Sequence, residues 1–179
     1  LFSDAASATL VDAGKESEGF LAASFVTDGS KHGSFIVPAG GQRQPLSPDT
    51  QKVTIDKSGN ALSPENIQMK GMDILVFVNS KVPKQINALM LDSGLSVGEI
   101  DWFVFHQASK VALDSLVRLL KLPSDKVLRR LEDIGNTVSA SIPITLQSYI
   151  DTGVVKRGDT ILISGFGVGL SWASAIIRL

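Results

Sequence analysis

The chain has 179 residues, of which 44% are hydrophobic and 20% charged, and its formal net charge is −1. It is long enough to bury the core of one domain, and with almost no net charge it has no overall field that attracts nucleic acid. No apolar run approaches the roughly 20 residues that span a bilayer, and no basic-then-apolar leader opens the sequence, so we expect a soluble cytoplasmic protein. The absence of cysteine excludes disulfides, thiolate metal ligands and a thiol nucleophile within this chain.

The first third of the chain is predicted to be largely extended. Residues 1–12 alternate small and apolar side chains, as a tightly packed strand does, and residues 19–27 are expected to be their hairpin partner. Because residue 1 is a leucine and the first residues already have a strand pattern, we expect the chain to begin inside a larger protein. Residues 28–66 contain five glycines and four prolines without helical periodicity, which indicates a long loop with short strands near 34–37 and 52–55. We expect His32 to be an exposed residue of this loop.

Helical spacing of apolar residues begins near Met69 and ends at Gly94, with Pro83 expected at a kink or in a first turn. Four further elements are predicted from the apolar pattern and its flanking turn residues. They are a buried strand at 101–106, a helix at 110–122 that Pro123 ends, a short helix at 126–133 capped by Ser124 and Asp125, and a helix at 140–152 that buries Ile142, Leu146 and Ile150 and has Pro143 in its first turn. The chain then closes with a hairpin whose arms, 160–164 and 170–179, flank a glycine-rich corner at 165–169.

His106 is placed where the apolar run WFVF gives way to the polar residues that precede a helix. It therefore lies at the carboxyl end of a strand, which is where open α/β sheets bind ligands. A lone histidine there is also compatible with a packed or solvated side chain. A neutral imidazole N–H and an asparagine amide are both uncharged donors, so His106 and Asn136, if they converge on one carbonyl oxygen, would stabilise an enolate without a metal.

Other interpretations of these residues remain open. Asn136 is also a suitable residue for a local turn, and the corner glycines suit a tight hairpin as well as a second set of backbone oxyanion donors. Lys110, Arg118 and Lys121 share a helix face with Asp114, which is typical of a solvated surface. The sequence contains no GxGxxG, P-loop or HExxH motif, and two histidines without cysteine do not make an ordinary zinc site.

Five stretches together resemble the C-terminal half of a β-ketoacyl-acyl carrier protein synthase III, in the thiolase-like superfamily. LFSDAASATLV is similar to that family's LFGDGAGAVVL, IQMKGMDILVFV to its MNG-plus-helix segment, and DWFVFHQAS to its strand ending in HQAN. LEDIGNTVSASIP is similar to YGNTSAASIP, and SGFGVGLSWASAIIRL to the closing GFGGGxTWGSALVRF. The resemblance runs from residue 1 to residue 179.

The resemblance implies an acyltransferase that joins an acyl thioester to malonyl-acyl carrier protein with loss of CO₂, using coenzyme A or carrier-protein thioesters as substrates and no bound cofactor or metal. An N-terminal half would supply the acylated cysteine, so this chain alone should be inactive. Carried over, His106 and Asn136 hold the malonyl thioester carbonyl. The backbone N–H of Val168 would lie at the acyl oxyanion, with Phe166 and Gly167 beside it.

Departures from the family pattern affect the contact with the carrier protein. Where the family has HQANxRI, this chain has HQASKVA, so Ser109 replaces an asparagine and Val111 an arginine that contacts carrier protein. Lys110 and Arg118 are candidates to compensate. Val168 replaces a glycine, which a backbone donor tolerates if its φ is negative. These changes leave open an acyltransferase that does not decarboxylate.

The expected fold is an α/β thiolase-like half, a mixed five-stranded sheet with packed helices. Its exposed apolar surface should associate with the N-terminal half or with a second copy, as in a homodimer. A non-catalytic thiolase-like partner subunit is the alternative function from another class. Hydrolysis by a Ser-His pair is disfavoured because there is no GxSxG elbow.

Overall fold

The computed structural model describes residues 2–14 and 18–179. They form two compact units, one made of Leu1–Val26, Phe77–Phe166 and Trp172–Leu179, the other of Thr27–Val76 and Gly167–Ser171. The helices are α1 Gly71–Ser93, α2 Lys110–Leu120, α3 Leu131–Ile134 and α4 Ser141–Asp151, with short 3-10 turns at Gly29–Ser34, Val97–Glu99, Ser124–Lys126 and Val138–Ala140. The strands are β1 Gly19–Thr27, β2 Phe35–Ile36, β3 Thr54–Ile55, β4 Ala61–Leu62, β5 Gln68–Met69, β6 Trp102–Phe105, β7 Val127–Leu128, β8 Thr160–Gly167 and β9 Ser171–Arg178.

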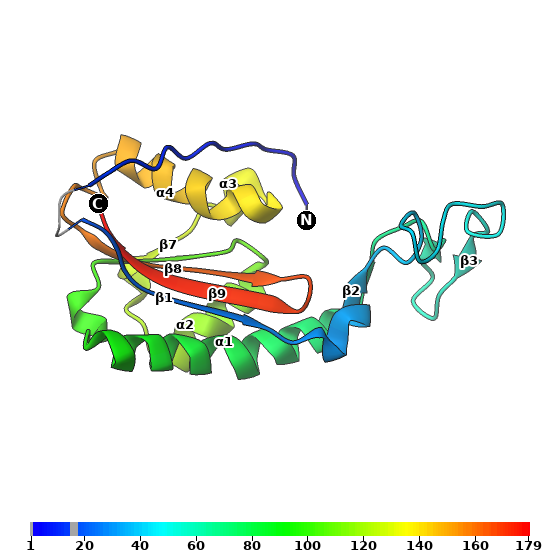
Figure 1. Cartoon of the computed structure of the whole chain (residues 1–179), viewed down its shortest axis with the longest axis horizontal. Coiled ribbons are helices and arrows are strands. Elements are labelled where there is room, and N and C mark those ends of the chain that lie inside the picture. The colour runs from blue at the N-terminus through cyan, green and yellow to red at the C-terminus, as the bar shows by residue number, and fades with distance from the viewer. Residues whose placement is uncertain (1, 15–17) are drawn as a thin grey trace. The chain divides into compact units, whose positions relative to one another are not determined.

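The first unit is built on a five-stranded sheet in the order β1-β9-β8-β6-β7. Strand β6 runs parallel to both neighbours, so that Phe103 lies opposite Val127 of β7 and Leu162 of β8. Helices α1 and α2 cover one face of the sheet and α3 and α4 the other (Figure 1). This arrangement confirms the expected α/β fold with a mixed five-stranded sheet.

Strand β6 lies at the centre of the core because its apolar run has helices on both sides. Phe103, Val104 and Phe105 are each at most 1% exposed, as expected for a parallel strand buried on both faces. Val104 packs with Leu128 and Ile161 in a cluster that α4 covers with Ile142, Leu146 and Tyr149. Burying each side chain of this kind contributes about 1.5–3 kcal/mol to the free energy of folding. The packing of these residues therefore fixes the position of the carboxyl end of β6.

Helix α1 is continuous through Pro83, which lies in its middle. Of the two positions expected for Pro83, a kink or a first turn, the first turn is therefore excluded. Pro83 is buried together with its neighbours on the sheet-facing side, and this packing offsets the hydrogen bond that a proline ring removes. Gln85 anchors the same helix, because its Nε2 donates to the Ser24 carbonyl at 2.9 Å and its Oε1 accepts from the Ser174 hydroxyl at 3.0 Å.

Two expectations in the C-terminal part were also wrong. Residues 126–133 do not form one helix, because Val127 and Leu128 are buried as strand β7 at the edge of the sheet and α3 follows them. Ile150 is 36% exposed, and Tyr149 packs against the core in its place. Pro143 does lie in the first turn of α4, where its missing N–H costs little.

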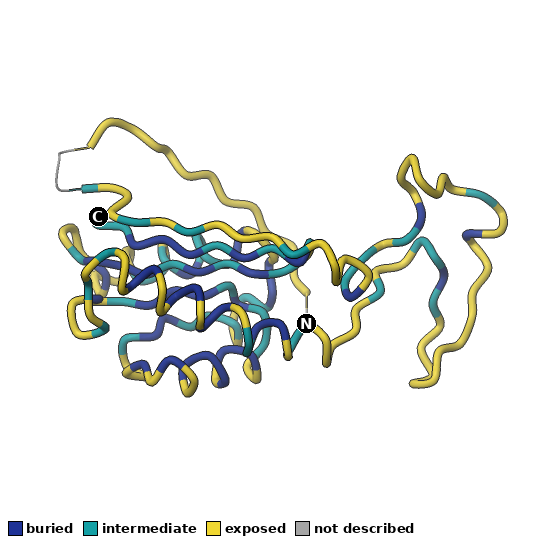
Figure 2. The backbone as a smooth tube through the Cα atoms, turned by 60° about the horizontal axis from the view of Figure 1, so that its bottom comes forward, coloured by how far each residue is buried: buried dark blue, intermediate teal, exposed yellow. Residues whose placement is uncertain are grey.

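The N-terminal arm, residues 2–14, is exposed along its whole length (Figure 2). Its contact with the rest of the unit includes a bridge at Phe2, where the Ser3 N–H donates to the Asn136 carbonyl at 3.0 Å. Strand β1 pairs with β9 instead, so the expected hairpin between the arm and β1 is wrong. An open cavity of about 500 Å³ separates residues 6–10 from α4. Apart from the bridge at Phe2, the alternating pattern of the arm thus occurs in a segment that is not assigned to any strand of the described sheets.

The second unit contains the glycine- and proline-rich loop. Its two short antiparallel pairs join β2 to β5, with Phe35 opposite Met69, and β3 to β4, with Thr54 opposite Leu62. These pairs confirm the two short strands predicted near 34–37 and 52–55. His32 is exposed in the 3-10 turn Gly29–Ser34, as expected. No helix in residues 2–14 and 18–179 is long and apolar enough to cross a membrane.

Candidate functional site

His106 follows directly after β6, at its carboxyl end. Its backbone N–H donates to the Ser164 carbonyl at 2.8 Å, which continues the parallel ladder to β8, and its own carbonyl accepts from the Ala108 N–H at 2.8 Å. Ser109 then caps α2 by accepting the Ala112 N–H at 3.2 Å. His106 is thus separated from Ser109, the N-cap of α2, by only two residues, Gln107 and Ala108. The position predicted from the sequence is therefore correct.

Gln107 is fully buried, with 0% exposure, and its side chain stabilises this turn by hydrogen bonds. Its Nε2 donates to the Phe105 carbonyl at 2.8 Å, and its Oε1 accepts the Arg130 N–H at 3.0 Å. The side chain thus ties the end of β6 to the residue that precedes α3. Sequence reasoning did not single out this glutamine, although its place within HQAS was a usable signal.

The His106 imidazole is clamped on two sides. Its Nδ1 lies 2.7 Å from the Ser141 hydroxyl oxygen, and its ring meets the Phe166 ring edge to face, with centroids 5.6 Å apart and planes at 73°. Burial lowers the pKa of His106, and a hydrogen bond to the Val138 carbonyl opposes this shift. Because its ordinary pKa is about 6.5, the imidazole is neutral at pH 7. A neutral ring is the state that the predicted donor role requires.

Asn136 lies just beyond α3 and is 5% exposed. The chain reaches it through Gly135, whose φ of 67° and ψ of −165° suit a residue without a Cβ. Its Oδ1 accepts the Val138 N–H at 3.0 Å, and its Nδ2 donates to the Ala108 carbonyl at 3.3 Å. The local-turn interpretation thus holds for the oxygen, and one of the two Nδ2 hydrogens is used by Ala108.

The peptide groups of Val138 connect the two predicted donors. The Val138 N–H donates to Asn136 Oδ1, and a backbone hydrogen bond with Val138 raises the pKa of His106. Asn136 also donates to the carbonyl of Ala108, so it lies beside the turn that follows His106, 30 positions away in sequence. Val138 has a φ of 52°, which is unusual for a β-branched residue and marks a strained position. Strain at such a place is held by its surroundings, here by the hydrogen bonds to both side chains.

The glycine-rich corner is divided between the two units. Phe166 belongs to the first unit and contacts His106. Gly167 ends β8 and Val168 begins the turn to β9, both in the second unit, and Val168 is 61% exposed. Valine can replace the family's glycine at position 168 if its φ is negative. The described non-glycine residues with positive φ do not include Val168, so this condition is met.

The predicted carrier-protein contacts lie on and around α2. Lys110 lines a cavity of about 200 Å³ together with Arg129 and Arg130, while Arg118 is exposed in the last turn of α2 and Val111 is 65% exposed. Asp114 pairs with Arg129, and Asp133 with Arg130 at 3.2 Å. These ion pairs reduce the positive charge of the surface without removing it.

The residues that the structure describes contain no group of three or more His, Cys, Asp or Glu side chains that could hold a metal ion. The polar groups near His106 are neutral ones, those of Ser141, Asn136 and the Val138 backbone. The chemistry that such a set supports is hydrogen-bond donation to an oxygen atom that gains negative charge.

The chain is similar to known proteins along its whole length. Residues 90–179, half of the chain, match the family described as 3-oxoacyl-[acyl-carrier-protein (ACP)] synthase III C terminal. The chain belongs to this family. Two synthase III relatives are the β-ketoacyl-[acyl-carrier-protein] synthase III of Microcystis aeruginosa, 35% identical over 99% of this chain and 51% of that protein, and that of Clostridium perfringens, 34% identical over 100% and 52%.

The fold of the synthase III family is matched as well. A crystal structure of 3-oxoacyl-(acyl-carrier-protein) synthase III is similar with a TM-score of 0.90 and 34% identity, covering 95% of this chain and 50% of that one. The chain thus spans about half the length of the synthase III relatives it matches. These findings confirm the family resemblance and the thiolase-like fold predicted from the sequence.

Proposed function

We propose that this chain is the C-terminal catalytic half of a decarboxylating acyltransferase, which condenses an acyl thioester with malonyl-acyl carrier protein to 3-oxoacyl-acyl carrier protein. The observation that carries the proposal is the placement of two neutral donors, His106 and Asn136, against the backbone of Val138 at the carboxyl end of β6. Membership of the synthase III family supports it.

In the proposed reaction, the His106 ring N–H and the second Asn136 amide hydrogen bind the thioester carbonyl oxygen of the malonyl group. The bond between the malonyl α-carbon and its carboxylate breaks, CO₂ leaves, and the electron pair forms an enolate whose oxygen the two donors stabilise. The enolate carbon then attacks the acyl thioester carbonyl, and the cysteine thiolate leaves. Neutral donors suit this step because a cation at the same place would also stabilise the carboxylate that must depart.

The nucleophilic cysteine is proposed to come from an N-terminal half, since the chain itself has none. On its own the chain is then inactive, because it cannot form the acyl-enzyme. Gly167 and the Val168 N–H are proposed to serve the acyl oxyanion, with Phe166 packed on the His106 ring. The substrates are coenzyme A or carrier-protein thioesters, and the reaction needs no bound cofactor.

Acyl carrier protein is the proposed macromolecular partner, bound at the surface around Ser109, Lys110 and Arg118. The support is positive charge around the cavity that Lys110, Arg129 and Arg130 line, because acidic partners are attracted by such a patch. A helix-capping role already occupies the Ser109 hydroxyl. We therefore assign the contact chiefly to the basic residues.

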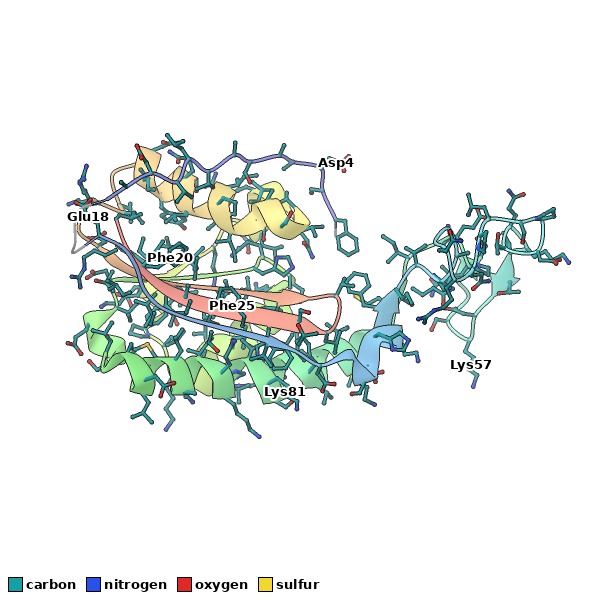
Figure 3. The ribbon with its side chains drawn as sticks, in the orientation of Figure 1. Asp4, Glu18, Phe20, Phe25, Lys57 and Lys81 are labelled. Carbon is teal, nitrogen blue, oxygen red and sulfur yellow. The ribbon has the colours of Figure 1, made fainter. Side chains whose placement is uncertain are left out.

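An N-terminal half and a second copy are the proposed assembly partners, in a cytoplasmic homodimer. The support is apolar surface in the first unit: Leu10 is 91%, Phe25 79%, Val11 79% and Phe20 71% exposed. Phe20 and Phe25 project from β1 (Figure 3). Exposed apolar side chains of this size on the arm and on β1 favour burial against a partner.

A non-catalytic partner subunit is the second candidate, and the absence of cysteine from the chain is the observation that favours it. An acyltransferase of the same family that does not decarboxylate is a variant of the main proposal. Mass spectrometry after incubation with acyl thioesters separates the partner subunit from both enzymes, because only an enzyme gains the acyl mass on a cysteine. Release of CO₂ from malonyl-acyl carrier protein separates the two enzymes from each other.

The test measures release of labelled CO₂ from malonyl-acyl carrier protein by the full-length protein, the chain together with its N-terminal half. His106→Ala and Asn136→Ala should each lower the rate about 10²–10³-fold, the usual loss when one oxyanion donor is removed. Cysteine acylation, followed by mass spectrometry, should stay largely intact in both.

Matched controls are His32→Ala and Asn87→Ala, which replace the same residue types at exposed positions and should leave the rate unchanged. Unchanged decarboxylation in either site variant would remove that residue from the mechanism. Loss of acylation together with decarboxylation would instead indicate a general structural role.

A further inference from the structure

We propose that the Ser141 hydroxyl is a positioning group that holds His106 in the tautomer with its hydrogen on Nε2. The inference rests on the proposed function, because it states how the ring becomes a donor toward substrate, but its test is direct and does not require turnover. Ser141 is the first residue of α4 and is 0% exposed.

The contacts of Ser141 fix the direction of its hydrogen bond. Its Oγ accepts the Gln107 backbone N–H at 3.3 Å and lies 2.7 Å from His106 Nδ1. A hydroxyl has one hydrogen and two lone pairs. With one lone pair facing Gln107, the hydrogen is free to point at the imidazole, and Nδ1 is the acceptor at hydrogen-bonding distance.

The opposite arrangement leaves a hydrogen without a partner. If Nδ1 carried the hydrogen and donated it to Ser141, the hydroxyl hydrogen would need another acceptor, and the described residues offer it none. A buried donor without an acceptor is unfavourable. The structure therefore favours a hydroxyl that donates to Nδ1, which places the ring hydrogen on Nε2.

The surroundings support a neutral ring with a fixed plane. Burial disfavours the imidazolium ion, as does the positive end of the α4 dipole, where Ser141 lies. Phe166 packs edge to face against the same ring. With Nδ1 bonded to Ser141 and the ring packed against Phe166, the plane of the imidazole is fixed. The backbone hydrogen bond with Val138 also requires a hydrogen on the ring, because a carbonyl only accepts. With Nδ1 as the acceptor from Ser141, that hydrogen is on Nε2.

Long-range proton–nitrogen NMR of the 179-residue chain tests the proposal, because it shows which imidazole nitrogen is protonated. The chain has only two histidines, so assignment is simple. In His106 we expect an unprotonated Nδ1 and a protonated Nε2. His32 is the internal reference, since its Nδ1 lies 3.1 Å from the Gly29 carbonyl, which can only accept. A protonated Nδ1 in wild-type His106 overturns the proposal without any variant.

Three variants separate positioning from general stability. Ser141→Ala should give His106 signals of mixed tautomers, while Ser141→Thr, which keeps the hydroxyl, should restore the wild-type pattern. Thr145→Val removes another fully buried hydroxyl one turn further along α4, one without a hydrogen-bond partner, and should leave the pattern unchanged. If Ser141→Ala keeps the wild-type signals, Ser141 does not set the tautomer.

Kinetics in the full-length protein connects the tautomer to the reaction. Ser141→Ala should slow malonyl decarboxylation about tenfold, less than the ~10²–10³-fold loss on deleting a donor, with cysteine acylation unchanged. Should His106→Ala leave decarboxylation unchanged while the NMR pattern is as expected, the proposed function fails and the role of Ser141 in the ring tautomer stands.

Discussion

At the scale of single residues, the site is defined by what restrains each donor. His106 is restrained by Ser141 and Phe166, and Asn136 by Val138 and Ala108. The sequence indicated both donors because neutral N–H groups suit an enolate, yet their proximity across 30 positions came from the family resemblance alone. Ser141 was missed because a serine before Ile-Pro resembles any other helix-start residue.

The pKa of His106 makes a prediction about stability. Burial lowers this pKa in the folded chain, whereas the unfolded chain takes up a proton near the ordinary value of about 6.5. The unfolded state therefore binds more protons below pH 6.5, so the free energy of unfolding should fall as the pH falls from 6.5 through the lowered pKa and be unaffected above.

Urea unfolding at pH 7.5 and pH 5.5 measures this effect, above the range in which Asp56 and Glu99, whose pKa values are lowered, take up protons. His106→Gln should reduce the difference between the two pH values. His32→Gln, at an exposed position, is the matched control and should not. An equal pH dependence in wild type and His106→Gln would contradict the buried neutral state.

At the scale of elements, long periodic segments were predictable and short ones were not. Strand β1 was predicted with its observed bounds, and α1, α2 and α4 to within a few residues, because apolar spacing reflects the face each element buries. Strand β7 has two residues, too few to show a period, and its identity depends on pairing with β6. Tertiary pairing of this kind is not visible in local sequence.

Gln107 links two of these elements, and its removal should be costly. Gln107→Leu keeps a similar volume but leaves the buried Arg130 N–H and Phe105 carbonyl without the partners they have now. We expect the free energy of unfolding to drop by about 1–3 kcal/mol, measured by urea titration.

Gln147→Leu is the comparison, because Gln147 is exposed and bonds Asp151 on its own helix. Its effect should be within about 0.5 kcal/mol. If Gln107→Leu and Gln147→Leu have the same free energy of unfolding, the hydrogen bonds of Gln107 do not stabilise the contact between β6 and α3.

At the scale of the whole chain, apolar surface on β1 and the N-terminal arm sets its behaviour in solution. Among the described residues, Leu10, Val11, Phe20 and Phe25 are each more than 70% exposed. The alternating pattern of residues 1–12 predicted a packed strand, and the arm is instead extended and exposed. The pattern was a sound indication of burial, but the sheet that would bury it is not formed by the described residues.

The chain by itself should therefore associate. Sedimentation velocity at micromolar concentration should show dimers or larger species, and replacing Phe20 and Phe25 with serine should shift the distribution toward monomer. Replacing Lys57 and Lys81, charged residues on other surfaces (Figure 3), with serine should have no such effect. A compact wild-type monomer would contradict the expectation.

The backbone of Val138 has a consequence for how this site varies among relatives. The main chain of Val138 donates to Asn136 and raises the pKa of His106 through a backbone hydrogen bond, while its side chain is 58% exposed. The main chain of residue 138 therefore matters more to the site than its side chain, although a φ of 52° there disfavours β-branched residues such as valine. The family motif YGNTSAASIP has serine where this chain has valine, so the chemistry of the side chain at position 138 is a poor guide to whether a homologue has kept its two donors.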